Sequence, residues 1–159
     1  HCIRPATVCG FSPRMRLDLT VNALTYSALE NKKIFIHGGS QIRPNVHIDD
    51  MCEAYIFFIN KKNVKPDTYN IGFENKSVAK IAKLIEKNIK SKLIFQKNKS
   101  DPRSYRLDST KIINKGFKPK KGILSAIEEL AKLYKNKKLR SRPNSHSLKW
   151  LKKITNIST

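Results

Sequence analysis

The residues best suited to chemistry are arginines placed at the ends of short, rigid elements. Arg43 follows a glycine turn at 38–39 and precedes Val46-His47-Ile48, whose apolar–polar alternation is typical of a half-buried strand. A guanidinium held in this way presents several donors in a fixed plane, which suits a phosphate. We therefore predict that Arg43 binds a phosphate group. An ion pair to Asp49 or Asp50 is the structural alternative.

A further arginine, Arg103, lies in the extended segment from Asp101 to Asp108, and Lys97 and Lys99 lie just upstream of it.

A polar residue interrupts the apolar stripe of the first predicted helix. Asn22 recurs at helical spacing with Met15, Leu19 and Tyr26. A buried asparagine must find hydrogen-bond partners, so Asn22 is either a structural link or a contact to a substrate.

The elements that position these residues alternate between strand and helix, which predicts an α/β fold. Pro at 13 after Ser12 predicts a helix that runs to about Leu29. Asp49 or Asp50 is expected to cap the helix that ends near Asn60. Strands are predicted over 2–8, 33–37, 46–48, 68–72 and 93–95, and further helices after Ser77, after Ser109, after Gly122 and around Trp150.

Composition limits the function classes. The 159 residues carry a net charge of +21, which invites nucleic-acid binding. The lysines are spread over nearly every predicted helix, however, and a genome rich in A and T explains much of the excess. No apolar run is long enough to span a membrane and no secretory leader is visible, so we expect a cytoplasmic protein with no membrane partner. Three irregularly spaced cysteines indicate reduced thiols and no metal site.

Four segments together resemble one enzyme family. They are Arg4 to Gly10, Gly38 to Asp50, Tyr69-Asn70-Ile71-Gly72, and Asp101 to Lys111 followed by Gly116-Phe117-Lys118-Pro119. Their order and spacing are similar to the carboxy-terminal half of the NAD-dependent epimerase/dehydratase family, the extended short-chain dehydrogenases/reductases. Cys9 and Phe11 depart from the tyrosine and proline that the family usually has at the first turn.

The resemblance implies a fold and an organisation. It implies the last strands and helices of a Rossmann-type domain together with a small α/β substrate-binding domain, the amino-terminal half being absent. Residues 1–13 would be a Rossmann strand and turn, 14–136 the substrate-binding domain interleaved with returning Rossmann elements, and 137–159 a basic tail.

The resemblance also implies a function. Arg43 and Arg103, approaching from separate loops, would bind the diphosphate of a nucleotide sugar from both sides. Lys97 and Lys99 would compete with Arg103 for this role. Thr7 would either lie near the sugar or be an ordinary inward strand residue. NAD or NADP would be bound mainly by the missing half, which would also supply the glycine fingerprint and the catalytic Tyr-x-x-x-Lys pair. We therefore expect no catalytic residues and no activity in this chain alone, and a homodimer when the protein is intact.

Two further functions stay open. A basic nucleic-acid-binding module would follow from the charge, although no helix-turn-helix, zinc-finger or RNA-binding signature is present. A relative that keeps the fold as a binding or scaffold protein, without catalysis, is the other.

Overall fold

The computed structural model describes residues 1–61, 63–96 and 103–155, and its mixture of strands and helices confirms the α/β prediction. The strands are β1 (Cys2–Pro5), β2 (Thr7–Cys9), β3 (Lys33–His37), β4 (Ile42–His47), β5 (Thr68–Ile71), β6 (Glu74–Ser77) and β7 (Lys92–Gln96). The helices are α1 (Thr20–Asn31), α2 (Ile48–Asn60), α3 (Val78–Asn88), α4 (Thr110–Ile113), α5 (Ile123–Lys135) and α6 (Ser147–Thr155), with a 3-10 turn at Pro143–Ser145.

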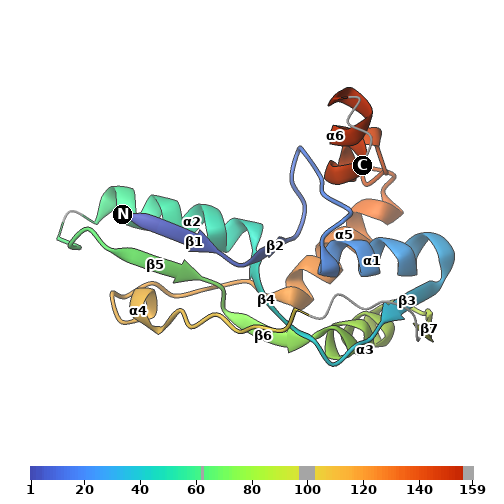
Figure 1. Cartoon of the computed structure of the whole chain (residues 1–159), viewed down its shortest axis with the longest axis horizontal. Helices are drawn as coiled ribbons and strands as arrows, with labels where there is room; N and C mark the ends of the chain where they lie inside the picture. Colours follow the sequence, from blue (N-terminus) through green and yellow to red (C-terminus); the bar gives the residue numbers. More distant parts are fainter. Residues whose placement is uncertain (62, 97–102, 156–159) are drawn as a thin grey trace.

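The strands form small, mostly parallel sheets. β1 pairs with β5 and β3 pairs with β7, both in parallel. Between them, β4 pairs in parallel with β2 and antiparallel with β6, which places Thr7 opposite Asn45 and Arg43 opposite Lys76. Figure 1 shows α2 alongside the β1–β5 pair, and α1, α3 and α5 gathered toward the β3–β7 pair.

Two apolar cores hold these layers together. The first joins α1, α3 and α5 to β3 and includes Ile34, Ile81 and Ile127, each with no exposed surface. The second joins α2, β5 and α4 around side chains such as Tyr69 and Ile112. β2 and β4 lie where the two cores meet, because Cys9 belongs to the first core and Val46 to the second.

The first helix begins later than predicted. It starts at Thr20, not at Ser12–Pro13, because contacts from distant residues hold the preceding segment in an irregular conformation. The amide of Leu17 donates to the carbonyl of Ser145 (2.8 Å). Asn22 Nδ2 donates to the carbonyl of Arg16 (3.0 Å), a group that a longer helix would use internally.

The prediction that an aspartate caps the next helix is wrong. α2 begins at Ile48, and its cap is His47, whose Nδ1 accepts from the amide of Asp49 (3.2 Å). The buried Asp50 carboxylate instead accepts from the amides of Lys120 (3.0 Å) and Lys121 (2.9 Å), and it thereby fixes the approach to α5. Asp49 pairs with the Lys121 ammonium, which lowers the pKa of the Asp49 carboxyl group.

Ser77 does cap α3 as predicted, because its Oγ accepts from the amide of Lys80 (3.3 Å). β6, which precedes it, was not predicted. Within the described ranges, no helix is both long and apolar enough to cross a membrane.

Candidate functional site

A cleft of about 440 Å³ opens between β2, the turn that follows it and the start of α1. We call it the Thr7 cleft. Its lining consists of Pro5, Ala6, Thr7, Val8, Gly10, Ser12, Arg14, Arg16, Leu19, Asn22, Ile48 and Tyr105. The described lining contains hydroxyl, amide and guanidinium donors and no carboxylate, which favours an anionic or polyhydroxylated ligand. Thr7 and Asn22, both predicted from the sequence, therefore border the same space.

Asn22 is fully engaged with the protein backbone. Its side chain is 3 % exposed, and its Oδ1 accepts from the amide of Gly10 (3.1 Å). Its Nδ2 donates to the carbonyls of Gly10 (3.4 Å) and Arg16 (3.0 Å). These bonds are the structural link that the sequence allowed for, and they fix both sides of the Thr7 cleft.

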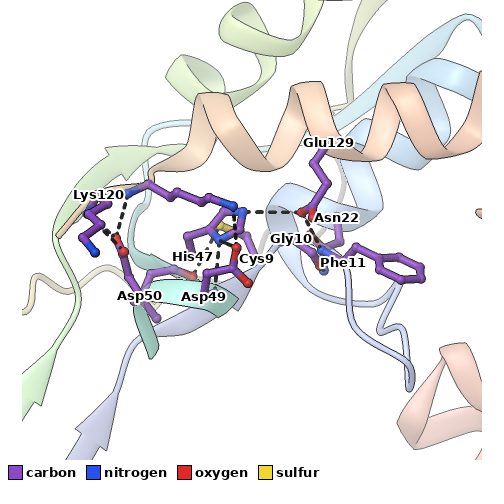
Figure 2. A network of polar contacts seen from close by, with 11 residues as sticks. Cys9, Gly10, Phe11, Asn22, His47, Asp49, Asp50, Lys120 and Glu129 are labelled. Carbon is purple, nitrogen blue, oxygen red and sulfur yellow. Dashed lines mark hydrogen bonds and ion pairs between the residues drawn. The ribbon is translucent and has the colours of Figure 1, made fainter. Parts of the chain in front are cut away.

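A buried histidine supports the same turn from behind. His47 is 1 % exposed, and its Nε2 lies 3.4 Å from Glu129 Oε2 on α5 (Figure 2). Because Nδ1 accepts from Asp49, the proton of a neutral imidazole lies on Nε2 and faces the carboxylate. Glu129 Oε2 also accepts from the amide of Phe11 (3.0 Å). His47 and Glu129 thus hold the wall of the cleft without lining it.

Position 10, which lines the Thr7 cleft beside His47, requires a glycine. Its φ is +100°, and a Cβ there would lie 2.9 Å from His47 Nε2. Cys9, just before it, is buried, and its Sγ donates to the carbonyl of Val46 (3.4 Å). Burial raises the pKa of the Cys9 thiol to about 12, so this cysteine stays protonated and is no nucleophile.

Arg43 lines a second cleft of about 370 Å³, which we call the Arg43 cleft. Its lining consists of Thr20, Ala23, Leu24, Phe35, His37, Gln41, Arg43 and Val78. Gln41 shapes the adjoining glycine turn, because its Oε1 accepts from the amide of Gly39 (2.6 Å) and its Nε2 donates to the carbonyl of His37 (2.7 Å).

The Arg43 side chain is only 8 % exposed. Its Nη1 donates to the carbonyls of Ile42 (3.2 Å) and Arg103. Its guanidinium carbon lies 6.0 Å from the ring centroid of Tyr105, a residue that lines the Thr7 cleft. Arg43 therefore lies between the two clefts, and the structure brings the predicted pair Arg43 and Arg103 together through a backbone contact.

Arg103, the other arginine of the predicted pair, is exposed, and the competing Lys97 and Lys99 lie outside the described residues. Asp49 and Asp50 have the lysine and backbone partners described above. Among the described residues, no group of three or more His, Cys, Asp or Glu side chains is placed to hold a metal ion.

One Tyr-x-x-x-Lys spacing does occur, at Tyr134 and Lys138, but its surroundings do not suit a general base. The Tyr134 hydroxyl donates to Glu30 Oε2 (2.9 Å), which raises the pKa of the phenol, whereas a tyrosine base needs a lowered pKa. Neither residue lines the Thr7 cleft or the Arg43 cleft.

Comparison with known proteins identifies the fold. Residues 1–72, which carry Thr7, Asn22, Arg43 and His47, match the model of the NAD dependent epimerase/dehydratase family. The resemblance to this family is confirmed. It covers the strand β2, the helix α1 and the whole run from the glycine turn through α2.

Solved structures of nucleotide-sugar enzymes have the same fold. A UDP-glucose 4-epimerase from Thermotoga maritima, solved with UDP-glucose, superposes with a TM-score of 0.70 at 24 % identity, covering 85 % of this chain and 45 % of that one. A UDP-glucuronic acid 4-epimerase from Bacillus cereus, solved with UDP-glucuronic acid and NAD, gives 0.68 at 26 % identity, covering 84 % and 44 %. The ADP-L-glycero-D-manno-heptose-6-epimerase from Helicobacter pylori gives 0.64 at 22 %, covering 80 % and 41 %. The chain thus spans less than half the length of these structures.

Sequence reasoning missed two parts of the site. The His47–Glu129 contact joins residues far apart in the chain, and only the polar histidine inside an apolar strand pointed to it. The Arg43 cleft was also missed, although an aromatic residue, Phe35, beside a glycine turn was a usable signal.

Proposed function

We propose that this chain forms the nucleotide-sugar-binding portion of an NAD(P)-dependent sugar-nucleotide epimerase, dehydratase or reductase. The observation that carries the proposal is the position of Arg43. Its nearly buried guanidinium lies between the Thr7 cleft and the Arg43 cleft, 6.0 Å from Tyr105. A diphosphate is the part of a nucleotide sugar that lies between its base and its sugar, so one arginine at this point can hold the middle of such a ligand.

The two clefts suit the two ends of the ligand. In the proposed arrangement the sugar occupies the Thr7 cleft, where Thr7 offers a hydroxyl and Asn22 fixes the turn. The base occupies the Arg43 cleft, where the ring of Phe35 is 38 % exposed and available for stacking. Arg43 and Arg103 bind the diphosphate, and each charge-assisted hydrogen bond contributes about 1.5–3 kcal/mol.

The redox step belongs to the proposal for the whole protein. The family model and the fold both support NAD or NADP as the cofactor, and one of the similar enzymes was solved with NAD. When bound, the nicotinamide would accept a hydride from a sugar carbon. The residues of this chain would bind and orient the sugar nucleotide for that step. A cytoplasmic location and a homodimer complete the proposal.

Calorimetric titration of the full chain with UDP-glucose and UDP-glucuronic acid tests this function. We expect saturable binding that Arg43→Ala weakens about 10- to 100-fold, since it removes one or two charge-assisted hydrogen bonds. Arg140→Ala is the matched control, because Arg140 is exposed and lines neither cleft. Equal affinity of the Arg43→Ala and Arg140→Ala variants would remove Arg43 from the site.

A further inference from the structure

The helix α6 has two chemically distinct faces. At about 3.6 residues per turn, its apolar side chains fall on one arc and its lysines on the other. The apolar arc consists of Leu148, Trp150, Leu151 and Ile154, and the basic arc of Lys149, Lys152 and Lys153. Among the described residues, three members of this arc stay open to solvent, since Leu148, Leu151 and Ile154 are 66 %, 47 % and 55 % exposed, whereas Trp150 is half-buried.

The first turn of α6 is nevertheless fixed to the body of the protein. The amide of Ser147 donates to Asp18 Oδ2 (3.1 Å), and Arg14 Nη2 donates to Ser147 Oγ (3.4 Å). The Arg14 guanidinium carbon also lies 5.6 Å from the ring centroid of Trp150. Figure 1 shows α6 at one extremity, beyond the end of α5. The helix therefore presents Leu148, Leu151 and Ile154 outward from a fixed base.

The segment of sequence that contains α6 carries charge of one sign. From Lys137 to Thr155 the charged side chains are Lys137, Lys138, Arg140, Arg142, Lys149, Lys152 and Lys153, all basic. A second copy that docked through its own α6 would bring the same basic side chains against this segment and would be repelled there. The complementary partner is an extended anionic surface with an apolar layer beneath it.

We propose that α6 binds the surface of a membrane that contains anionic phospholipids. Leu148, Leu151 and Ile154 insert at the boundary between headgroups and acyl chains, and the lysines contact lipid phosphates. Nine residues are far too few to span a bilayer, so the helix lies in the plane of the surface. This revises the expectation that a membrane is not a partner, which rested on the absence of a spanning segment. It goes beyond the proposed sugar-nucleotide site.

Trp150 provides a direct readout, because it is the single tryptophan of the chain and lies on the apolar arc. The full chain is titrated with vesicles of phosphatidylcholine and with vesicles of phosphatidylcholine mixed with phosphatidylglycerol. We expect cosedimentation and a blue shift of the Trp150 emission with the mixed vesicles, and neither with phosphatidylcholine alone. Added salt should weaken the binding.

Substitutions then separate the two arcs. Leu151→Glu should lower partitioning into the mixed vesicles roughly tenfold or more, because it places a charge among the inserted side chains. Lys149→Gln together with Lys153→Gln should lower it about tenfold or more, since each basic residue near an anionic surface contributes about fivefold. Leu124→Glu is the matched control, because Leu124 lies on α5 and is 41 % exposed.

Three outcomes would overturn the proposal. The first is no binding to the mixed vesicles. The second is binding without a Trp150 blue shift, or weakened equally by Leu151→Glu and Leu124→Glu, which would mean attraction by the overall charge. The third is a dimer in sedimentation velocity, without vesicles, that Leu151→Glu dissociates. The apolar arc would then bind a second copy.

Discussion

At the scale of single residues, the site depends on side chains that form hydrogen bonds with backbone groups and so fix their position. Asn22 satisfies three backbone groups on two segments, and Glu129 satisfies one more while facing His47. Neither needs a ligand to have a structural reason for its position. Arg43 also donates to backbone carbonyls, but it differs from them in that it both lines one cleft and lies beside Tyr105, which lines the other.

Asn22→Ala should therefore destabilise the chain itself. It leaves the Gly10 amide and the carbonyls of Gly10 and Arg16 without their partner, at a cost of about 2–3 kcal/mol in the free energy of unfolding. Urea denaturation followed by circular dichroism measures this loss. Asn31→Ala, at the exposed end of the same helix, should change stability by much less. An Asn22→Ala variant as stable as Asn31→Ala would mean that the amide is not needed to hold the turn.

At the scale of elements, helix boundaries set by neighbouring residues were predictable from the sequence, and boundaries set by contacts between distant residues were not. Ser77 lies immediately before α3 and caps it, and Gly122 immediately precedes α5, so both boundaries were predictable. The start of α1 depends on Leu17 bonding to Ser145, more than a hundred residues away, which no local pattern encodes. The cap of α2 failed for a similar reason, since Asp50 is occupied by the distant amides of Lys120 and Lys121.

Asp18 links the segment before α1 to the start of α6, and its contribution to the free energy of unfolding should depend on pH. Its carboxylate pairs with Arg16 (2.9 Å) and accepts from the Ser147 amide at the start of α6. The hydrogen bond from Arg16 lowers the pKa of Asp18 in the folded chain. The resulting stability is present above the unfolded value, about 3.9, and is lost as pH falls through the lowered value.

We expect Asp18→Asn to lower the free energy of unfolding by about 0.5–1 kcal/mol at neutral pH, because solvent screens the pair. The difference from the unmodified chain should vanish in acid, once Asp18 is protonated in both states. Urea denaturation at a series of pH values measures it, with Glu86→Gln on the exposed face of α3 as the control. A difference that persists unchanged in acid would show that the ion pair is not its source.

At the scale of the whole molecule, two cores meet at β2 and β4, and both clefts open beside that junction. The fold family was predictable because four short motifs keep their order along the chain. The sequence did not predict which of these motifs contact each other. The structure shows that Arg43 lies against the backbone of Arg103. The net charge of +21 is a different kind of whole-molecule property, since it is spread over many surface side chains.

Because the charge is spread in this way, the affinity for nucleic acid and the affinity for nucleotide sugars should depend differently on salt concentration. Duplex DNA should bind weakly and non-specifically, with an affinity that falls roughly tenfold or more between about 50 and 200 mM salt, because binding releases counterions from many phosphates. UDP-glucose has one diphosphate, so its affinity should change far less. Fluorescence anisotropy with labelled DNA, beside calorimetry with UDP-glucose, makes the comparison.

Arg43→Ala should leave DNA binding nearly unchanged, because Arg43 is one of 33 Lys and Arg residues and is largely buried. Loss of DNA binding in that variant would instead assign the Arg43 cleft to nucleic acid.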